Sequence, residues 1–426
     1  MTAPLTRPQR KNPILRTRLP TLPPGARSRV ALGLTAAAAE GRFALQVCRA
    51  CQAVQYPPRE ACHACLSITL DWKAQNGAGE LIADTVLHHS NDLFFRERLP
   101  WRLGLIRLDC GVTVVAHLHG DVGAAPSRVR VAARLDRAGQ AVLAGLPDQE
   151  TPNMRDDKQL REFTCDPKFR KILITDAKSA TGQALVKALA AAGADLIWAG
   201  ETEPWKQVPG FDAIKAMAQS GVPAGASRDT QISIVPLDLT DSKSVQELAK
   251  QIGGKVDILI NNAEVHRPYG IGNRAGVEAA RSEMDINYFG LLRLAQEFGP
   301  GMRARAADGQ SSAVAWVNLL SIYALANFPP HGTFSASKAA AHSLAQCLRA
   351  EMRPAGVRVV NLFPGPIDDE WNQLQPPPKV APAALAKAVV NALQQGIEDV
   401  YPGDVAQEWL ERWRDNPKAL ERELSA

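Results

Sequence analysis

The apolar residues of this chain follow two different periods along its length. Between residues 79 and 119, apolar and polar positions alternate or form short apolar runs, which predicts strands at 79–87, 104–109 and 112–119. Glycine and aspartate residues separate these runs, as in turns between neighbouring strands. Strands that follow one another without intervening helices predict a small antiparallel barrel.

From residue 171 onward, short apolar runs alternate with helical periods instead. Residues 172–175 predict a buried strand, and Leu185, Val186 and Leu189 then recur at helical spacing before a stop at Gly193. Strands that alternate with helices in this way predict a parallel, doubly wound α/β sheet of the Rossmann type.

Two longer helices are predicted in the same region, over residues 277–298 and 335–352. Both carry apolar faces, formed in the first by residues such as Met284 and Leu291 and in the second by Leu344 and Leu348. Such faces suit either the interior of one subunit or the pairing of two subunits.

Length and composition agree with a multidomain protein. The chain has 426 residues, which is too long for one core, and 46% of them are hydrophobic. No apolar run approaches the ~20 residues of a membrane helix, and no signal peptide pattern opens the chain, so we expect a cytoplasmic protein without membrane contact. Aromatic residues make up 6% and the net charge is +5, which argues against nucleic acid as a partner.

The composition divides the chain into four segments. Residues 1–30 are rich in proline and arginine and hold no acidic side chain, which predicts an extended basic arm that is either a disordered tail or a docking arm. Residues 31–146 would form a zinc ribbon and an OB-fold barrel. The polar residues 147–170 are expected to link this part to a Rossmann domain at 171–426.

Cysteine spacing supplies the first chemical signal. Cys48 and Cys51 form one Cys-x-x-Cys knuckle, and Cys62 and Cys65 form a second one after ten residues. Four thiolates at this spacing can close a tetrahedral site without an open position, which predicts a structural zinc ion. The alternative, two disulfides, suits a reducing cytoplasm poorly.

A zinc ribbon that leads into such a barrel resembles the acyl-CoA-associated zinc-ribbon/OB-fold family. The resemblance covers about residues 31–146 and depends on the four cysteines, Pro57-Pro58, the glycines 77 and 79, and residues 95–105. Members of that family pair with thiolases or thiolase-like aldolases and help to hold acyl-CoA. The resemblance therefore implies a thiolase or aldolase partner and acyl-CoA substrates.

The second part resembles the short-chain dehydrogenase/reductase family, because a series of its landmarks occurs in order. These are Asp238 to Asp241, Asn261-Asn262-Ala263, Asn287, Ser321, Lys338 and Pro364-Gly365. The resemblance implies that Asn287, Ser321, residue 334 and Lys338 stand at the positions of the family's catalytic tetrad.

Residue 334 departs from that tetrad. The family carries a tyrosine there, which would donate and accept the proton at the substrate carbonyl, but this chain has Phe334. Tyr323 and His331 lie nearby in the sequence, yet neither is expected to replace the missing acid. Without the phenol, we expect Ser321 and Asn287 to satisfy local backbone groups.

The cofactor site departs as well. The family's phosphate turn, Thr-Gly-x-x-x-Gly-x-Gly, is here Thr175, Asp176, Ala180 and Gly182, so only the helix-packing glycine remains. The Asp176 carboxylate would repel a phosphate charge by about 3 kcal/mol at ~5 Å and an effective dielectric constant of ~20. Gly200 stands where an NAD-binding relative has a carboxylate.

No basic residue that could select NADP follows Gly200 directly. Asp238 and Asn261 complete the expected cofactor-binding set, which we expect to be impaired. The sequence thus argues against binding of NAD(P).

These observations predict a non-catalytic or weakly catalytic subunit of a bacterial acyl-CoA degradation complex. It would link a thiolase or aldolase to an active short-chain dehydrogenase subunit. Two alternatives remain open at this point: an active NADP-dependent 3-hydroxyacyl-CoA or ketone dehydrogenase that uses an unusual acid, and a binding protein that senses a nucleotide or acyl-CoA.

Overall fold

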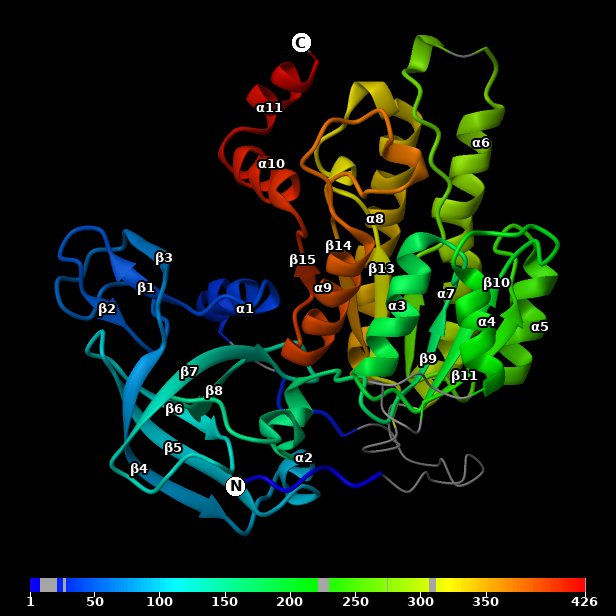
Figure 1. Ribbon diagram of the computed structural model, residues 1–426. Coiled ribbons are helices and arrows are strands. Elements are labelled where there is room, and N and C mark those ends of the chain that lie inside the picture. Colours follow the sequence, from blue (N-terminus) through cyan, green and yellow to red (C-terminus); the bar gives the residue numbers. More distant parts are fainter. Residues whose placement is uncertain (8–20, 26–27, 221–229, 274, 306–311, 426) are drawn as a thin grey trace. The chain divides into compact units, whose positions relative to one another are not determined.

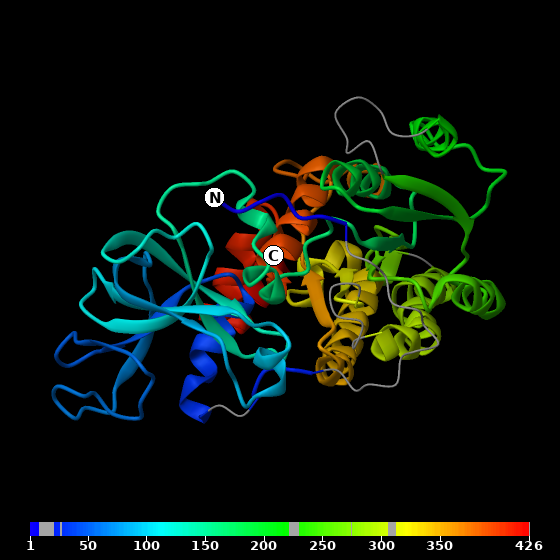
Figure 2. The same ribbon diagram turned by 90° about the horizontal axis from the view of Figure 1, so that it is seen from below.

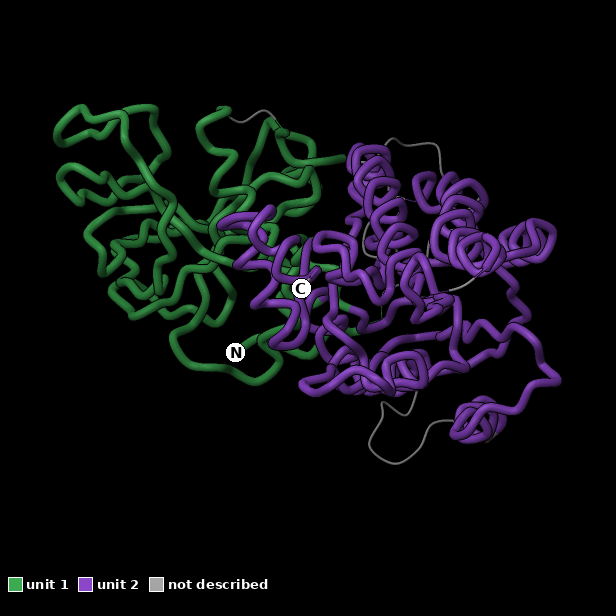
Figure 3. The backbone as a smooth tube through the Cα atoms, turned by 90° about the horizontal axis from the view of Figure 1, so that it is seen from above, with its two compact units in different colours: residues 1–7, 20–166, 394–398 green, residues 8–19, 167–393, 399–426 purple. Residues whose placement is uncertain are grey.

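A computed structural model describes residues 1–7, 21–25, 28–220, 230–273, 275–305 and 312–425. The chain forms two compact units (Figure 3). Unit 1 contains residues 1–7, 20–166 and 394–398, and unit 2 contains the rest. Most of the predicted basic arm, residues 8–20 and 26–27, lies outside the described residues.

Unit 1 begins with a short helix and a small sheet. Helix α1 (Leu32–Ala39) precedes a three-stranded antiparallel sheet of order β2-β1-β3, with β1 at Ala44–Cys48, β2 at Val54–Gln55 and β3 at Leu70–Ala74. This sheet holds the cysteine knuckles.

A closed barrel of order β4-β5-β6-β8-β7 completes unit 1 (Figure 1). Its strands are β4 (Ala78–Leu87), β5 (Trp101–Leu108), β6 (Thr113–Leu118), β7 (Ser127–Leu135) and β8 (Ala141–Pro147), with the short helix α2 (Leu93–Arg96) between the first two. Alternate side chains such as Leu81, Ile106 and Val129 point into one apolar core. The three strands predicted from the alternating pattern are confirmed as β4, β5 and β6.

The polar segment 147–170, predicted as a link, is mostly folded onto the barrel. It contains the 3-10 helices Met154–Asp156 and Leu160–Phe163, and the boundary between the units falls after Asp166. Phe163 is buried beside Trp101, with ring centres 6.1 Å apart. The acidic residues of this segment are used locally, as when Asp157 Oδ2 accepts a hydrogen bond of 2.9 Å from the Gly120 amide.

His117 and His119 fall on one face of the strand predicted at 112–119, where we expected them to face solvent, and the segment 147–170 corrects this expectation. The His117 ring lies 5.0 Å from Phe163, and its Nδ1 accepts a 2.8 Å hydrogen bond from the Trp101 indole. His119 is fully buried, and its Nε2 lies 2.9 Å from the Met154 carbonyl. Periodicity within the strand could not reveal this cover, because it comes from residues more than thirty positions away.

Unit 2 is built on a seven-stranded parallel sheet of order β11-β10-β9-β12-β13-β14-β15. Its strands are β9 (Lys171–Ile174), β10 (Leu196–Glu201), β11 (Gln231–Pro236), β12 (Ile258–Asn261), β13 (Ala315–Leu319), β14 (Arg358–Leu362) and β15 (Asp399–Val400). The order reverses at β9, so the carboxyl ends of β9 and β12 border the crevice where such sheets bind ligands.

Helices cover both faces of this sheet (Figures 1 and 2). One face carries α5 (Ser242–Ile252), α7 (Leu291–Ala304) and α8 (Gly332–Met352), which share a core with Leu173, Trp316 and Val359. The opposite face carries α3 (Ala180–Ala191) and α9 (Pro382–Gln395). The other helices are α4 (Phe211–Ser220), α6 (Glu278–Met284), α10 (Asp404–Asp415) and α11 (Pro417–Leu424). The predicted Rossmann-type architecture is confirmed.

One predicted helix is interrupted. The expected helix at 277–298 consists of α6, a π-helical turn at Asp285–Gly290, and α7. Insertion of a wider turn re-aims the side chains that follow it, and such turns are frequent at functional sites. Here the turn contains Asn287, one of the predicted tetrad residues. The helix predicted at 335–352 is confirmed as α8, which begins three residues earlier.

Candidate functional site

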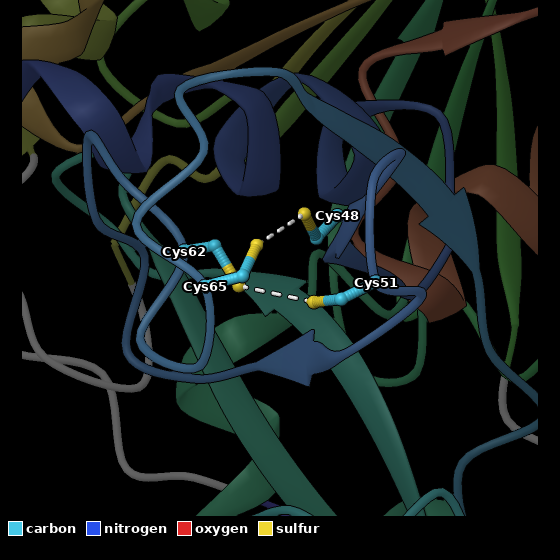
Figure 4. Close-up of side chains that lie close together, drawn as sticks. All are labelled: Cys48, Cys51, Cys62 and Cys65. Atoms are coloured by element: carbon cyan, nitrogen blue, oxygen red, sulfur yellow. Dashed lines mark hydrogen bonds between the residues drawn. The ribbon is translucent and has the colours of Figure 1, made fainter.

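The four predicted zinc ligands lie together at the tips of two knuckles (Figure 4). Their sulfur atoms all lie within 4.8 Å of one another, and the Cys48–Cys65 and Cys51–Cys62 sulfur pairs are each 3.6 Å apart. A disulfide would need ~2.05 Å, whereas four thiolates ~2.3 Å from a zinc ion lie about 3.8 Å apart. The geometry therefore fits a tetrahedral structural zinc site.

Backbone amides in both knuckles favour the thiolate form. The amide of Cys51 lowers the pKa of Cys48 to about 6, and the amide of Cys65 lowers the pKa of Cys62 in the same way. Because metal ligands must be deprotonated, this arrangement prepares the sulfurs of Cys48 and Cys62 to bind zinc.

The predicted phosphate turn connects β9 to α3. The carboxylate of Asp176 folds back on this turn, where its Oδ1 accepts hydrogen bonds from the amides of Lys178 (2.9 Å) and Ser179 (3.3 Å). Burial raises the pKa of Asp176. Amides at such a turn are the donors that a phosphate would use, and here the chain's own carboxylate occupies them.

Gly182, the one glycine that remains from the family turn, is required by close packing. A Cβ atom at Gly182 would lie 1.9 Å from the carbonyl oxygen of Asp176, so α3 can pack on the turn only with glycine there. Gly200 is also confined, because a Cβ atom would lie 2.5 Å from the carbonyl oxygen of Thr175. A carboxylate side chain at position 200 would not fit this backbone. Ala180 is the first residue of α3.

Lys178 is a residue that the sequence did not single out. Its buried ammonium donates to three carbonyl oxygens of the loop after β10, those of Thr202 (3.1 Å), Glu203 (2.7 Å) and Lys206 (2.6 Å). A basic group therefore reaches the end of the second strand from the phosphate turn rather than from the residues after Gly200. A lysine within a turn of small residues was the available signal.

The remaining predicted cofactor residues contact local groups. Thr175 Oγ1 accepts hydrogen bonds from the amides of Asn262 (3.1 Å) and Ala263 (3.0 Å), which ties the ends of β9 and β12 together. Asn261 Oδ1 accepts from the Thr175 hydroxyl at 3.3 Å. Asp238 Oδ1 accepts from the Thr240 amide at 2.8 Å and orders the loop after β11.

Three of the four predicted tetrad positions converge on the start of α8. Phe334 lies in its first turn, and the ammonium of Lys338 lies 5.4 Å from the centre of that ring. Asn287 reaches the same helix by donating a 2.8 Å hydrogen bond to the Ser337 hydroxyl. Ser321 instead caps a short helix, since its Oγ accepts a hydrogen bond of 3.2 Å from the Tyr323 amide.

The two side chains considered as replacement acids are both buried. Tyr323 stacks on Phe328 with ring centres 5.2 Å apart, and burial raises its pKa. His331 lies with its Nδ1 2.9 Å from Nε2 of His266. Burial lowers the pKa of His331 to about 4 and that of His266 to about 2, so both rings are neutral at pH 7.

His266 and Glu264 are the other site residues that sequence reasoning missed. The His266 ring stacks on Phe334, with ring centres 3.7 Å apart and an angle of 15° between the planes. Glu264 forms an ion pair of 2.8 Å with Lys338. Glu264 follows Asn261-Asn262-Ala263 directly and His266 lies two residues further on, so a charged residue at position 264 was the signal available in the sequence.

Comparison with known proteins identifies the second part of the chain. Residues 170–377 match the family described as short chain dehydrogenase. A curated relative, dehydrogenase/reductase SDR family member 7C of Mus musculus, is 31% identical over 240 residues, which are 56% of this chain and 71% of the relative. This chain belongs to the short-chain dehydrogenase family.

Other relatives extend the comparison. A fatty acyl-CoA reductase of Acinetobacter baylyi is 31% identical over 211 residues, covering 47% of this chain and 63% of that protein. A short chain dehydrogenase of Burkholderia cenocepacia, solved in complex with NADP, is 31% identical with a TM-score of 0.52, and the match covers 61% of this chain and 99% of that one. Because this relative binds NADP, the expectation that the present chain does not bind it remains a prediction.

The first part of the chain matches two further family descriptions. Residues 35–71 match the ChsH2 rubredoxin-like zinc ribbon domain, and residues 72–140 match the ChsH2 C-terminal OB-fold domain. The predicted fusion of a zinc-ribbon/OB-fold part with a short-chain dehydrogenase part is thus confirmed. Within the described residues, no helix is both long enough and apolar enough to cross a membrane.

Proposed function

We propose that this chain is a non-catalytic or weakly catalytic cytoplasmic subunit of an acyl-CoA degradation complex. Its zinc-ribbon/OB-fold part would bind a thiolase or thiolase-like aldolase, and its dehydrogenase part would pair with an active short-chain dehydrogenase. Tethering of consecutive enzymes raises the effective concentration of an intermediate near the next site.

The observation that carries this proposal is the state of the tetrad. Phe334 has no proton to transfer, and its ring is covered by His266. Lys338 is engaged by Glu264, and Asn287 by backbone and Ser337. A group that moves the proton must reach the reacting oxygen of the substrate, and Phe334, at the position where the family has that group, offers none.

The phosphate turn supports the same proposal of a non-catalytic or weakly catalytic subunit. A phosphate would have to displace the Asp176 carboxylate from the amides of Lys178 and Ser179 and pass the Ala180 methyl. The turn is therefore proposed as an impaired cofactor site rather than a working one.

Acyl-CoA as the substrate class is supported from two sides. The first part of the chain matches ChsH2 domains, which resemble the acyl-CoA-associated family described above, and one relative of the second part is named a fatty acyl-CoA reductase. The full chain should therefore co-elute with a thiolase-type enzyme in size-exclusion chromatography. Separate elution at micromolar concentrations of both proteins would argue against the linking role.

A second candidate function is an NADP-dependent dehydrogenase of 3-hydroxyacyl-CoA or ketones, because a relative with 31% identity was solved with NADP. A fluorescence titration with NADPH, combined with a ketone reduction assay, separates the candidates. We expect neither saturable binding nor turnover. Binding without turnover would favour a nucleotide- or acyl-CoA-sensing protein, and binding with turnover would favour the dehydrogenase.

A further inference from the structure

Three consecutive residues after β12 each contact a different tetrad position. Glu264 contacts Lys338, Val265 contacts Asn287, and His266 contacts Phe334, the position of the missing tyrosine. One short segment of the chain thus meets three of the four positions.

The first contact is an ion pair that offsets the positive charge of Lys338. The Glu264 carboxylate lies 2.8 Å from the Lys338 ammonium, and the two side chains are 17% and 3% exposed. The same ammonium donates to the Leu319 carbonyl at 3.0 Å. In a site so little exposed to water, a carboxylate at this distance cancels most of the field that the ammonium would exert on a neighbouring group.

The second contact fixes the backbone of the segment. The Val265 amide donates to Asn287 Oδ1 at 3.0 Å, and Asn287 Nδ2 donates to the Val265 carbonyl at 2.9 Å. The amide of Arg267, just after the segment, donates to Glu283 Oε1 at 2.7 Å. These bonds tie the segment to α6 and to the π-helical turn that follows it.

The third contact covers the aromatic ring. His266 lies flat on Phe334, with ring centres 3.7 Å apart and an angle of 15° between the planes. Its Nε2 is hydrogen-bonded to His331 at 2.9 Å, and the other ring nitrogen of His331 lies 3.2 Å from Gln375 Nε2. A chain of polar contacts therefore holds the ring in place.

We propose that residues 264–266 act as a built-in occupant of the dehydrogenase site, here called the 264–266 plug. The plug neutralises Lys338 through Glu264 and closes one face of residue 334 through His266. This inference deepens the proposed function, on which it rests, because it assigns the idle state of the site to the segment after β12 as well as to the missing hydroxyl. Restoring the tyrosine alone would then place a phenol beside a neutralised lysine.

The test follows the ionisation of a phenol at position 334. The variant Phe334→Tyr introduces this phenol, and Phe334→Tyr/Glu264→Gln removes the opposing charge while an amide can still hydrogen-bond to Lys338. Among the described residues, the titratable groups in contact with the Phe334 ring are Lys338, His266 and Tyr323. Behind them, Glu264 pairs with Lys338 and His331 with His266. Asp369 lies near Glu264, and burial together with the Glu264 charge raises the pKa of Asp369 to about 6. Difference absorbance against the matching variant with phenylalanine at 334 isolates the new phenol from the other tyrosines.

In Phe334→Tyr we expect the phenol at position 334 to ionise with a midpoint at or above the ordinary value of about 10. In the double variant we expect it to fall by at least about one pH unit, because an uncancelled ammonium nearby favours the phenolate. Phe334→Tyr/Glu278→Gln is the matched control, since Glu278 is an exposed residue of α6 that pairs with Arg281, and it should leave the midpoint unchanged.

Equal phenol midpoints in Phe334→Tyr and Phe334→Tyr/Glu264→Gln would overturn the proposed role of the 264–266 plug. A midpoint well below 10 in Phe334→Tyr alone would overturn it as well. If Glu264→Gln unfolds the protein, Glu264→Ala replaces it with the same expected shift. The proposed function fails by a different result, ketone turnover by the unaltered chain, so the two failures are distinguishable.

Discussion

At position 334, one oxygen atom separates the side chain of this protein from the tyrosine of the family's tetrad, and further contacts surround that position. Glu264 pairs with Lys338, His266 covers one face of the Phe334 ring, and Asp176 accepts from an amide of the phosphate turn. One substitution is not expected to restore activity at a site that differs from the family's at several positions, since the effects of residues that act as a unit are not additive.

The variant Phe334→Tyr should therefore show no fast ketone reduction with NADPH or NADH. The new hydroxyl would stand beside a neutralised lysine and a turn whose amides are already occupied. Steady-state NADPH oxidation with a 3-ketoacyl-CoA measures this directly. Robust turnover in this single variant would mean that the cofactor site is intact.

The His266–His331 pair predicts a pH dependence of stability. Burial lowers the pKa of His266 from 6.5 to about 2, so between these values the unfolded chain binds a proton that the folded chain excludes. The neutral His266 therefore contributes its whole share to the free energy of unfolding above pH 6.5. Below pH 6.5 the free energy of unfolding falls by about 1.4 kcal/mol per pH unit for this one histidine.

Replacement of His266 by phenylalanine keeps an aromatic ring against Phe334 but removes the imidazole that binds a proton in the unfolded chain. Chemical denaturation between pH 7 and pH 4.5 should then show a shallower loss of unfolding free energy than in the unaltered chain. A slope that does not change would mean that His266 does not exclude the proton in the folded state.

Single residues also mark the limit of sequence reasoning. The positions of Phe334, Lys338 and the four cysteines could be predicted, because spacing along the chain carries them. The contacts of Lys178, Glu264 and His266 could not, because each joins residues far apart in sequence. The burial of His119 escaped prediction for the same reason.

Among the elements, α3 depends on a close approach to the turn that precedes it. The variant Gly182→Ala would push a methyl group against the Asp176 carbonyl, which lies 1.9 Å from the ideal Cβ position. We expect a loss of about 1–3 kcal/mol of unfolding free energy, in the range of overpacked sites. Gly254→Ala is the control, because a Cβ atom there would meet nothing within 4 Å. Equal stability of the two variants would refute the packing argument.

The zinc ribbon is an element that its metal should hold together, because the sheet β2-β1-β3 is small and its cysteines lie at ligand distances. Metal analysis should find one zinc ion per chain in the unaltered protein and none in Cys48→Ser. Cys110→Ser, which alters a cysteine outside the cluster, should retain zinc. A well-folded protein without metal would disprove the zinc site.

The element pattern itself was largely predictable. Period-two and helical patterns placed β4, β5, β6, β9 and α8 correctly, because burial of one face imposes those periods. The π-helical turn at Asp285–Gly290 was not predictable, since the apolar pattern continues through it and Asn287, within it, bonds to Val265, which lies outside that pattern.

For the whole molecule, the fusion of the two parts in one chain is the main support for the proposed role of linking two enzymes. One chain joins a ChsH2-type part to a short-chain dehydrogenase part that has Phe334 at the position of the family's tyrosine. Under the proposed function, this part contributes by pairing with an active enzyme, because a fold does not by itself imply its family's chemistry.

The most direct measurement is a steady-state assay of the isolated full chain with NADPH or NADH and either a 3-ketoacyl-CoA or a simple ketone. We predict no conversion above the level of a buffer control, at any cofactor concentration that saturates related enzymes. Sustained, enzyme-proportional oxidation of either nicotinamide would contradict the account.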